Sequence, residues 1–143
     1  MAEEAISAIE NIDDKATPVV KKRKIKRSVT NGQVHIQATF NNTIITFSDS
    51  QGAVISASSA GACGFRGSKK GTAYAAQVAA ERAGQIAKQQ FGFSSAVVQV
   101  KGIGLGRDSA IRTLGQLNIN VESIQDVTGI PHGGVRPRKA RRV

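Results

Sequence analysis

Positive charge is concentrated in two short segments of this chain, and that segregation decides which part can fold. Residues 21–31 hold six Lys and Arg and residues 129–143 hold five, and neither segment contains an Asp or Glu. Like charges repel, and these segments offer too little apolar surface to offset the entropy lost on ordering. Residues 32–128 hold eight basic and five acidic residues, the balance of an ordinary folded domain. We therefore predict one folded domain over residues 32–128.

Two extensions flank this domain, and we predict that both are disordered in the free protein. Residues 1–20 hold five acids and one base, so the extension over residues 1–31 is acidic and then basic. The acidic part is assigned no role. Residues 129–143 hold two prolines and three glycines beside their bases, which predicts a basic C-terminal arm.

The overall composition favours a nucleic-acid-binding protein and argues against several other classes. The formal net charge is +10 and the sequence pI is about 10.4, typical of chains that bind polyanions. Cys63 is the only cysteine and His35 and His132 are the only histidines, so we expect no disulfide, metal or cofactor. An acidic start and the lack of any run of about 18 apolar residues predict a cytoplasmic protein that is neither exported nor membrane-bound.

Hydrophobic periodicity over residues 32–128 predicts a series of strands and helices. Apolar and polar residues alternate from Gly32 to Phe40, a pattern typical of a half-buried strand. Asn41 and Asn42 suit a tight turn, because Asn tolerates positive φ. The later predicted elements are the strands Thr43–Asp49 and Ala53–Ser59, the helix Ala73–Phe91, the strand Ser95–Lys101, the helix Asp108–Leu117 and the strand Asn120–Val127.

The predicted order is βββαβαβ, which implies an α/β domain over residues 32–128, a mixed five-stranded sheet with two main helices in two or three layers. A strand–helix–strand connection normally makes its two strands parallel, whereas the first three strands can form an antiparallel meander. In the first helix Tyr74, Val78 and Ile86 fall near one face, and the many alanines predict close packing on the sheet. Gly92 is the expected C-cap.

A glycine-rich stretch, residues 60–72, precedes the first helix and includes Arg66, Lys69 and Lys70. Its glycines lack the P-loop spacing, which disfavours a nucleoside triphosphate. Three cations with open backbone amides favour a polynucleotide backbone instead. Phe65 in this stretch either stacks on a base or plugs the core, and we favour the core. The glycines of residues 102–106 lack the dinucleotide spacing and serve either a tight turn or an anion contact.

Enzyme chemistry has few candidate residues. The domain holds five acids, none of them in the first strand, where a two-metal nuclease of the ribonuclease H type would need one. Neither histidine lies in a pattern that suggests a catalytic triad. The chain is therefore not expected to be an enzyme, and a phosphate-handling enzyme ranks below a single-strand RNA- or DNA-binding module outside the ribosome.

Four segments together make a specific pattern. They are HIQATFNNTIITFSD (His35–Asp49), SAGACGFRGSKKGTAYAAQVAAE (Ser59–Glu81), VKGIGLGRDSAIRTL (Val100–Leu114) and DVTGIPHGGVRPRKARRV (Asp126–Val143). Through them the chain resembles the universal small-subunit ribosomal protein eleven family, bacterial type, over residues 21–143.

This resemblance implies a ribonuclease H-like motif without catalytic acids, in a structural constituent of the ribosome. Such a protein binds 16S rRNA on the platform of the 30S subunit and helps to shape the mRNA exit (Shine–Dalgarno) cleft. The implied neighbours are ribosomal proteins eighteen and twenty-one, protein seven nearby and the mRNA leader, with no membrane contact and no homo-oligomer.

Candidate RNA-binding residues come from the charge pattern and from the resemblance. The basic segment and the second glycine turn contribute Lys21, Lys22, Arg23, Lys24, Lys26, Arg27 and Arg107. The resemblance implies Asn41, Asn42 and Thr43 in the hairpin turn, Gly64, Phe65, Arg66, Gly67, Ser68, Lys69 and Lys70 in the loop, and His132, Arg136, Pro137, Arg138, Lys139, Arg141 and Arg142 in the arm. The chain departs from the family at Gly129 and Ala73, where Pro is usual, and at Gly133, where Asn is usual; we expect a looser arm and helix entry.

Overall fold

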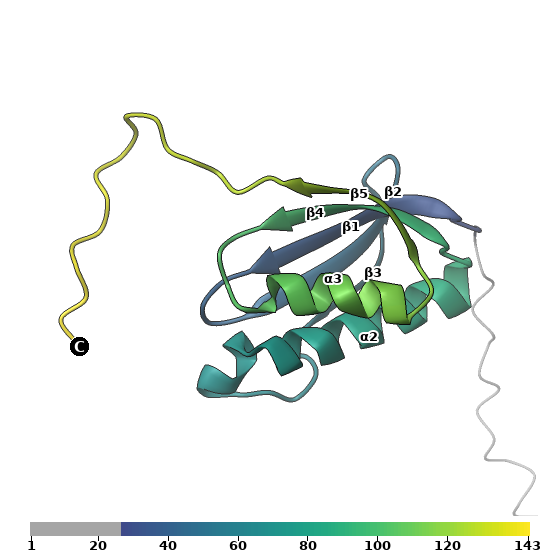
Figure 1. Ribbon diagram of the computed structural model, residues 1–143, viewed down its shortest axis with the longest axis horizontal. Coiled ribbons are helices and arrows are strands. Elements are labelled where there is room, and N and C mark those ends of the chain that lie inside the picture. Colours follow the sequence, from purple (N-terminus) through teal and green to yellow (C-terminus); the bar gives the residue numbers. More distant parts are fainter. Residues whose placement is uncertain (1–26) are drawn as a thin grey trace, which may run out of the picture.

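A computed structural model describes residues 27–143 (Figure 1). In this range the chain forms five strands, two α-helices and one short 3-10 helix. They are β1 (Asn31–Ala38), β2 (Thr43–Asp49), β3 (Val54–Ser59), η2 (Gly67–Gly71), α2 (Ala73–Phe91), β4 (Ser95–Lys101), α3 (Gly106–Gln116) and β5 (Asn120–Asp126). The predicted order of strands and α-helices is confirmed, whereas η2 was not predicted.

The five strands form one mixed sheet in the order β3-β2-β1-β4-β5. β1, β2 and β3 pair antiparallel, and β4 lies parallel to both β1 and β5. Figure 1 shows α2 and α3 side by side against the same face of the sheet. The domain therefore has two layers, and the opposite face of the sheet is left without a helix among the described residues.

The core lies between the sheet and the two helices. Val34 pairs with Phe47 and Ile36 with Ile45 across β1 and β2, and all four side chains are buried. Phe47 also meets Phe93 edge to face, with ring centroids 5.3 Å apart. Such aromatic pairs add to the stability that their buried apolar area provides.

Helix α2 contacts the sheet through small residues. Its buried positions are Ala75, Ala76, Ala79, Ala80, Ala83, Gly84 and Ala87. The expected close packing of alanines is confirmed, whereas none of Tyr74, Val78 and Ile86 is fully buried and Tyr74 is 65% exposed. The larger side chains lie beside the alanine face because only small residues let the helix approach the sheet closely.

Both ends of α2 are capped. The Thr72 hydroxyl accepts a hydrogen bond from the Ala75 N–H at the start. Gly92 ends the helix in the left-handed region at φ 68°, as predicted. The entry to the helix at Ala73 is thus ordered, so the expectation of a looser entry is wrong.

The second helix begins earlier than predicted, at Gly106, and ends at Gln116. Leu114 is fully buried and Ile111 packs partly against the core, which confirms the predicted inward face. After Asp126 the chain forms no further helix or strand and extends away from the domain (Figure 1). Within residues 27–143 no helix is both long and apolar enough to cross a membrane.

Candidate nucleic-acid interface

Three loops meet at one end of the sheet, and glycines let their backbones touch. A Cβ atom at Gly71 would overlap the carbonyl oxygen of Phe40, in the turn between β1 and β2. A Cβ at Gly102 would overlap the carbonyl oxygen of Ala38, and one at Gly104 that of Thr39. The β1–β2 turn is thus held between the glycine-rich stretch and the turn that follows β4. We call this the loop end of the sheet.

The β1–β2 turn is organised by hydrogen bonds of its own. The Thr39 N–H donates to the Asn42 carbonyl at 2.9 Å, and the Thr39 hydroxyl accepts from the Asn42 N–H at 3.1 Å. The Asn42 side-chain oxygen accepts from the Thr43 N–H at 2.9 Å. Asn41 is exposed and Asn42 half-buried, whereas Thr43 is fully buried. The structure thus corrects Thr43 as a candidate contact: its side chain lies beneath the turn and cannot reach RNA.

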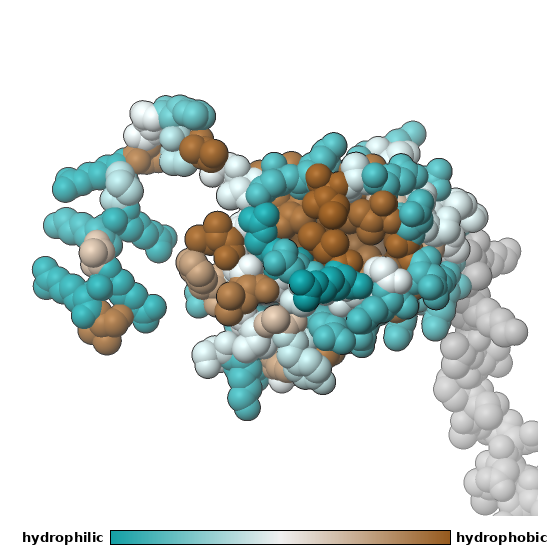
Figure 2. Space-filling model, in the orientation of Figure 1, coloured by the Kyte–Doolittle hydropathy of each residue, from teal (hydrophilic) through white to brown (hydrophobic). Residues whose placement is uncertain are grey.

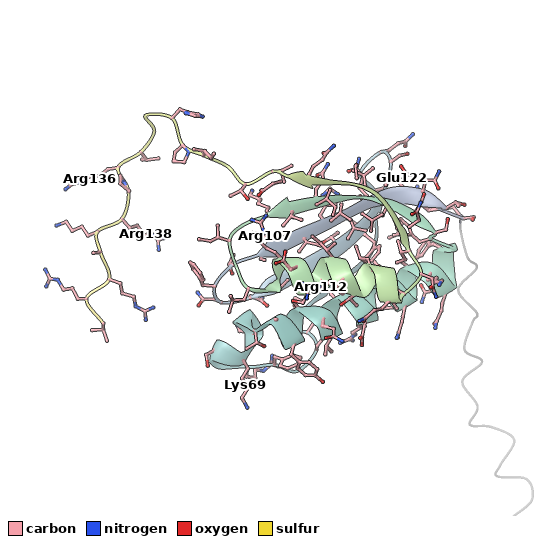
Figure 3. The ribbon with its side chains drawn as sticks, in the orientation of Figure 1. Lys69, Arg107, Arg112, Glu122, Arg136 and Arg138 are labelled. Atoms are coloured by element: carbon pink, nitrogen blue, oxygen red, sulfur yellow. The ribbon has the colours of Figure 1, made fainter. Side chains whose placement is uncertain are left out.

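The three cations of the glycine-rich stretch differ in their exposure and in their contacts. Arg66 donates from Nη1 to the Gly61 carbonyl at 2.8 Å and braces the loop, while part of its side chain stays exposed. Lys69, in η2, is exposed and projects from the body (Figure 3), and Lys70 is half-buried against Gly61. Gly64 and Gly67 have positive φ and Ser68 is exposed, so the loop also offers backbone groups to a ligand.

The aromatic residue of this stretch does not occupy the core, and its stacking on a base stays a prediction. Phe65 is half-buried and meets Tyr74 edge to face, with ring centroids 5.8 Å apart. It does not belong to the core cluster, so the preferred prediction of a core plug is wrong. The pair stiffens the junction between the loop and α2.

Apolar side chains at the loop end were missed by sequence reasoning. Phe40 is 70% exposed, Ile103 64% and Leu105 73%. Figure 2 shows brown surface at this end of the domain, facing the arm. Phe40 had been placed on the inner face of the first strand, but β1 ends at Ala38 and the turn directs Phe40 outward. The only sequence feature that indicates this early end of the strand is the asparagine pair that follows Phe40.

The C-terminal arm leaves from the same loop end. The Val127 N–H donates to the Val100 carbonyl at 2.9 Å, after which the arm is free of the sheet. Arg136 and Arg138 project from it (Figure 3). All the arm's candidate contacts are exposed, namely His132, Arg136, Pro137, Arg138, Lys139, Arg141 and Arg142. Gly133 has φ 63°, in the left-handed region that glycine adopts without strain.

Arg107 lies at the root of this arm. Its Nη2 is 2.8 Å from Asp126 Oδ2, and its Nη1 donates to the Gly102 carbonyl at 2.6 Å. The Thr128 hydroxyl donates to Asp126 and, together with Arg107, holds the pKa of the Asp126 carboxyl well below its usual range. Asp126 is therefore ionised at neutral pH.

Arg27 lies at the other end of the sheet. It pairs with Asp49, the last residue of β2, at 3.0 Å. Backbone N–H donation, chiefly from Ala53, holds the pKa of Asp49 below its ordinary value. The other predicted contacts of the basic segment, Lys21, Lys22, Arg23, Lys24 and Lys26, lie outside the described residues. Within residues 27–143 no group of three or more His, Cys, Asp or Glu could hold a metal ion.

Comparison with known proteins decides the family. The model of the family described as ribosomal protein S11 matches residues 32–142, which span the domain and nearly all of the arm. A small ribosomal subunit protein uS11 from Treponema pallidum is 57% identical over 125 residues, covering 87% of this chain and 98% of that protein. One from Teredinibacter turnerae is 52% identical over 129 residues, covering 90% and 98%.

This chain belongs to the uS11 family. A uS11c protein from Cyanidioschyzon merolae, 56% identical over 121 residues, covers 85% of this chain and 99% of that protein. Membership confirms the resemblance to ribosomal protein eleven that the four sequence segments indicated. The protein is a component of the small ribosomal subunit in the cytoplasm, with a structural and not an enzymatic role, and as such it binds ribosomal RNA.

Proposed function

We propose that this uS11 protein binds 16S rRNA on the platform of the 30S subunit through its loop end and its arm. The observation that supports this is the gathering of candidate contacts: within residues 27–143, all except Arg27 belong to the three loops, the arm or its root. Residues far apart in the sequence therefore form one surface. A surface with Asn, Gly, Lys and Arg suits phosphate and sugar contacts together with contacts to unpaired bases.

Binding proceeds by electrostatic docking and ordering of the arm. The arm's cations meet phosphates and release condensed counterions, which makes binding strongly dependent on salt. The loop end supplies a rigid shape, because its three backbones are in contact and cannot separate without moving the sheet. Of these two parts, the arm thus contributes more of the charge and the loop end more of the geometry.

The same placement gives the protein its proposed neighbours. On the platform it lies beside ribosomal proteins eighteen and twenty-one, with protein seven across the cleft through which the mRNA leader leaves. The exposed apolar side chains of Phe40, Ile103 and Leu105 support contacts with protein as well as RNA at the loop end. The protein thereby helps to shape the Shine–Dalgarno cleft without contributing chemistry.

Truncation of the arm tests this proposal. Deleting residues 136–143 removes five basic residues, and each lost phosphate contact flattens the slope of log affinity against log salt by about 0.7 to 0.9. If each of the five contacts one phosphate, we expect the slope for 16S rRNA to fall by about 3.5 to 4.5 units while the thermal midpoint stays unchanged. An undiminished slope would contradict the role of the arm.

Sedimentation separates the ribosomal function from the alternative of a free single-strand RNA- or DNA-binding module. A tagged chain expressed in cells should travel through a sucrose gradient almost wholly with the small subunit. Most of the chain remaining in the light fractions would favour the alternative. The experiment needs no mutation, so a failure to fold cannot confuse its outcome.

A further inference from the structure

An acidic residue stands at the root of the basic arm, where a polyanion is expected to bind. Asp126 is the last residue of β5, and its Oδ2 accepts from Arg107 Nη2 at 2.8 Å. Its Oδ1 accepts from the Thr128 N–H at 3.0 Å and from the Thr128 hydroxyl at 2.6 Å. A carboxylate at this place repels phosphate, so its presence needs a structural reason.

The contacts of Asp126 belong to a closed ring of hydrogen bonds. Arg107 Nη1 donates to the Gly102 carbonyl at 2.6 Å, and the Gly102 N–H donates to the Thr128 hydroxyl at 3.1 Å. The ring joins the turn after β4, the start of α3 and the first residues after β5. We call these four residues, Gly102, Arg107, Asp126 and Thr128, the arm-root clasp.

The arm-root clasp is itself fixed to the sheet. Gly102 has φ 100°, and its backbone packs against the carbonyl of Ala38, so this residue cannot shift toward β1. The neighbouring Val127 N–H donates to Val100 in β4. The direction in which the chain leaves the domain at Thr128 is therefore set by β1 and β4, through the clasp.

The contribution of the clasp to global stability is small. The Arg107 and Asp126 side chains are 31% and 53% exposed, and ion pairs that water can reach are screened and stabilise little. Their effect is local, because a fixed first segment reduces the volume that the arm explores before it meets RNA. Such pre-organisation lowers the entropy cost of binding.

We propose that Arg107 is a positioning residue: with Asp126 and Thr128 it aims the arm so that the cations from Arg136 onward reach the RNA that docks on the loop end. This rests on the proposed function. Two nitrogens of the Arg107 guanidinium are already used inside the clasp. The phosphate contacts come from the arm and from the glycine-rich stretch.

A substitution that removes the acid distinguishes positioning from simple electrostatics, because the two predict opposite signs. Asp126→Asn raises the net charge from +10 to +11, so attraction to phosphate alone would tighten binding. If the clasp aims the arm, binding to full-length 16S rRNA becomes roughly three- to tenfold weaker at every salt concentration. The salt slope stays unchanged, because the phosphates finally contacted are the same.

Glu122→Gln is the matched control. Glu122 lies on the same strand, is exposed (Figure 3) and makes no ion pair among the described residues. The charge change equals that of Asp126→Asn, so this variant should bind as the wild type does or slightly tighter. Equal affinities for the two variants would overturn the proposal.

Two further variants keep the test informative if Asp126→Asn disturbs the fold. Thr128→Val removes the hydroxyl at constant charge and should weaken binding, whereas unchanged binding would contradict the clasp. Arg107→Lys keeps the charge but cannot donate to Gly102 and Asp126 from two separate nitrogens. An affinity for 16S rRNA equal to that of the wild type would show that Arg107 acts only as a cation. If the wild type itself shows no salt-dependent binding to 16S rRNA, the proposed function fails instead of the clasp.

Discussion

Gly71 lies against the backbone carbonyl of Phe40 with no space between them for a side chain. This contact holds the glycine-rich stretch on the β1–β2 turn. Its φ lies outside the left-handed region, so the glycine is needed here for close approach. The shape of the loop end therefore depends on the absence of a Cβ atom at Gly71.

Gly71→Ala should push these two loops apart. Forcing an atom into a filled space typically costs about 1–3 kcal/mol, and we expect a loss of that order in the free energy of unfolding, measured with urea. Binding to 16S rRNA should weaken as well. Gly61→Ala is the control, because a Cβ there meets Lys70 Cδ at an ordinary 3.6 Å. Equal stability of the two variants would contradict the packing argument.

The double substitution Lys69→Ala and Lys70→Ala should weaken rRNA binding without affecting the fold. Neither lysine forms an ion pair among the described residues, and Lys69 is exposed. We expect the salt slope to fall by up to about two units, with an unchanged thermal midpoint. Lys88→Ala, on the last turn of α2, should alter the slope far less. A collapse of the midpoint would show that the lysines are structural.

The two aromatic pairs should contribute different amounts to the free energy of unfolding. Phe47 is fully buried in the core, and its replacement by Ala should cost about 3–5 kcal/mol. Phe65 contacts Tyr74 at a half-exposed site, so Phe65→Ala should cost much less. Urea unfolding measures both. Equal losses would mean that Phe65 belongs to the core after all.

Acid should weaken the fold through Asp126 and Asp49. Both folded-state pKa values lie below the ordinary carboxyl value of 3.8, so both groups contribute stability above that pH. The contribution is lost as the pH falls below 3.8 toward the folded-state values, where the carboxylates take up protons. Thermal midpoints measured between about pH 5 and pH 2 should fall less steeply in Asp126→Asn. The difference should be small, because water screens this exposed ion pair; a steeper fall in the variant than in the wild type would contradict the assigned interactions of Asp126.

The sequence predicted the elements well, because each has a local signal. Alternation marked the strands, and helix-forming residues before Gly92 marked α2 to the residue, from Ala73 to Phe91. The hairpin strand Thr43–Asp49 and the strand Ser95–Lys101 were also placed correctly. These signals depend only on residues that are neighbours in the sequence, so they can be read without the fold.

What depends on tertiary contact could not be predicted. Phe40 continues the alternation of β1, yet the turn directs it outward. The many alanines predicted close packing of α2, but which of its residues contact the sheet is set by the tertiary fold. The arm-root clasp joins residues from three segments, so no spacing reveals it. The basic stretches were visible in the sequence, but the meeting of three loops at one end needed the fold.

The alanine face of α2 also sets the thickness of the domain. A larger residue at Ala79 or Ala83, both fully buried, would lift the helix from the sheet. Thr72, which caps the helix, and Gly71 before it would move too, opening the contact with Phe40. Buried residues on the inner face of α2 would thus govern the shape of the proposed RNA surface, so substitutions at these alanines should be tolerated as poorly as substitutions at the contacts themselves.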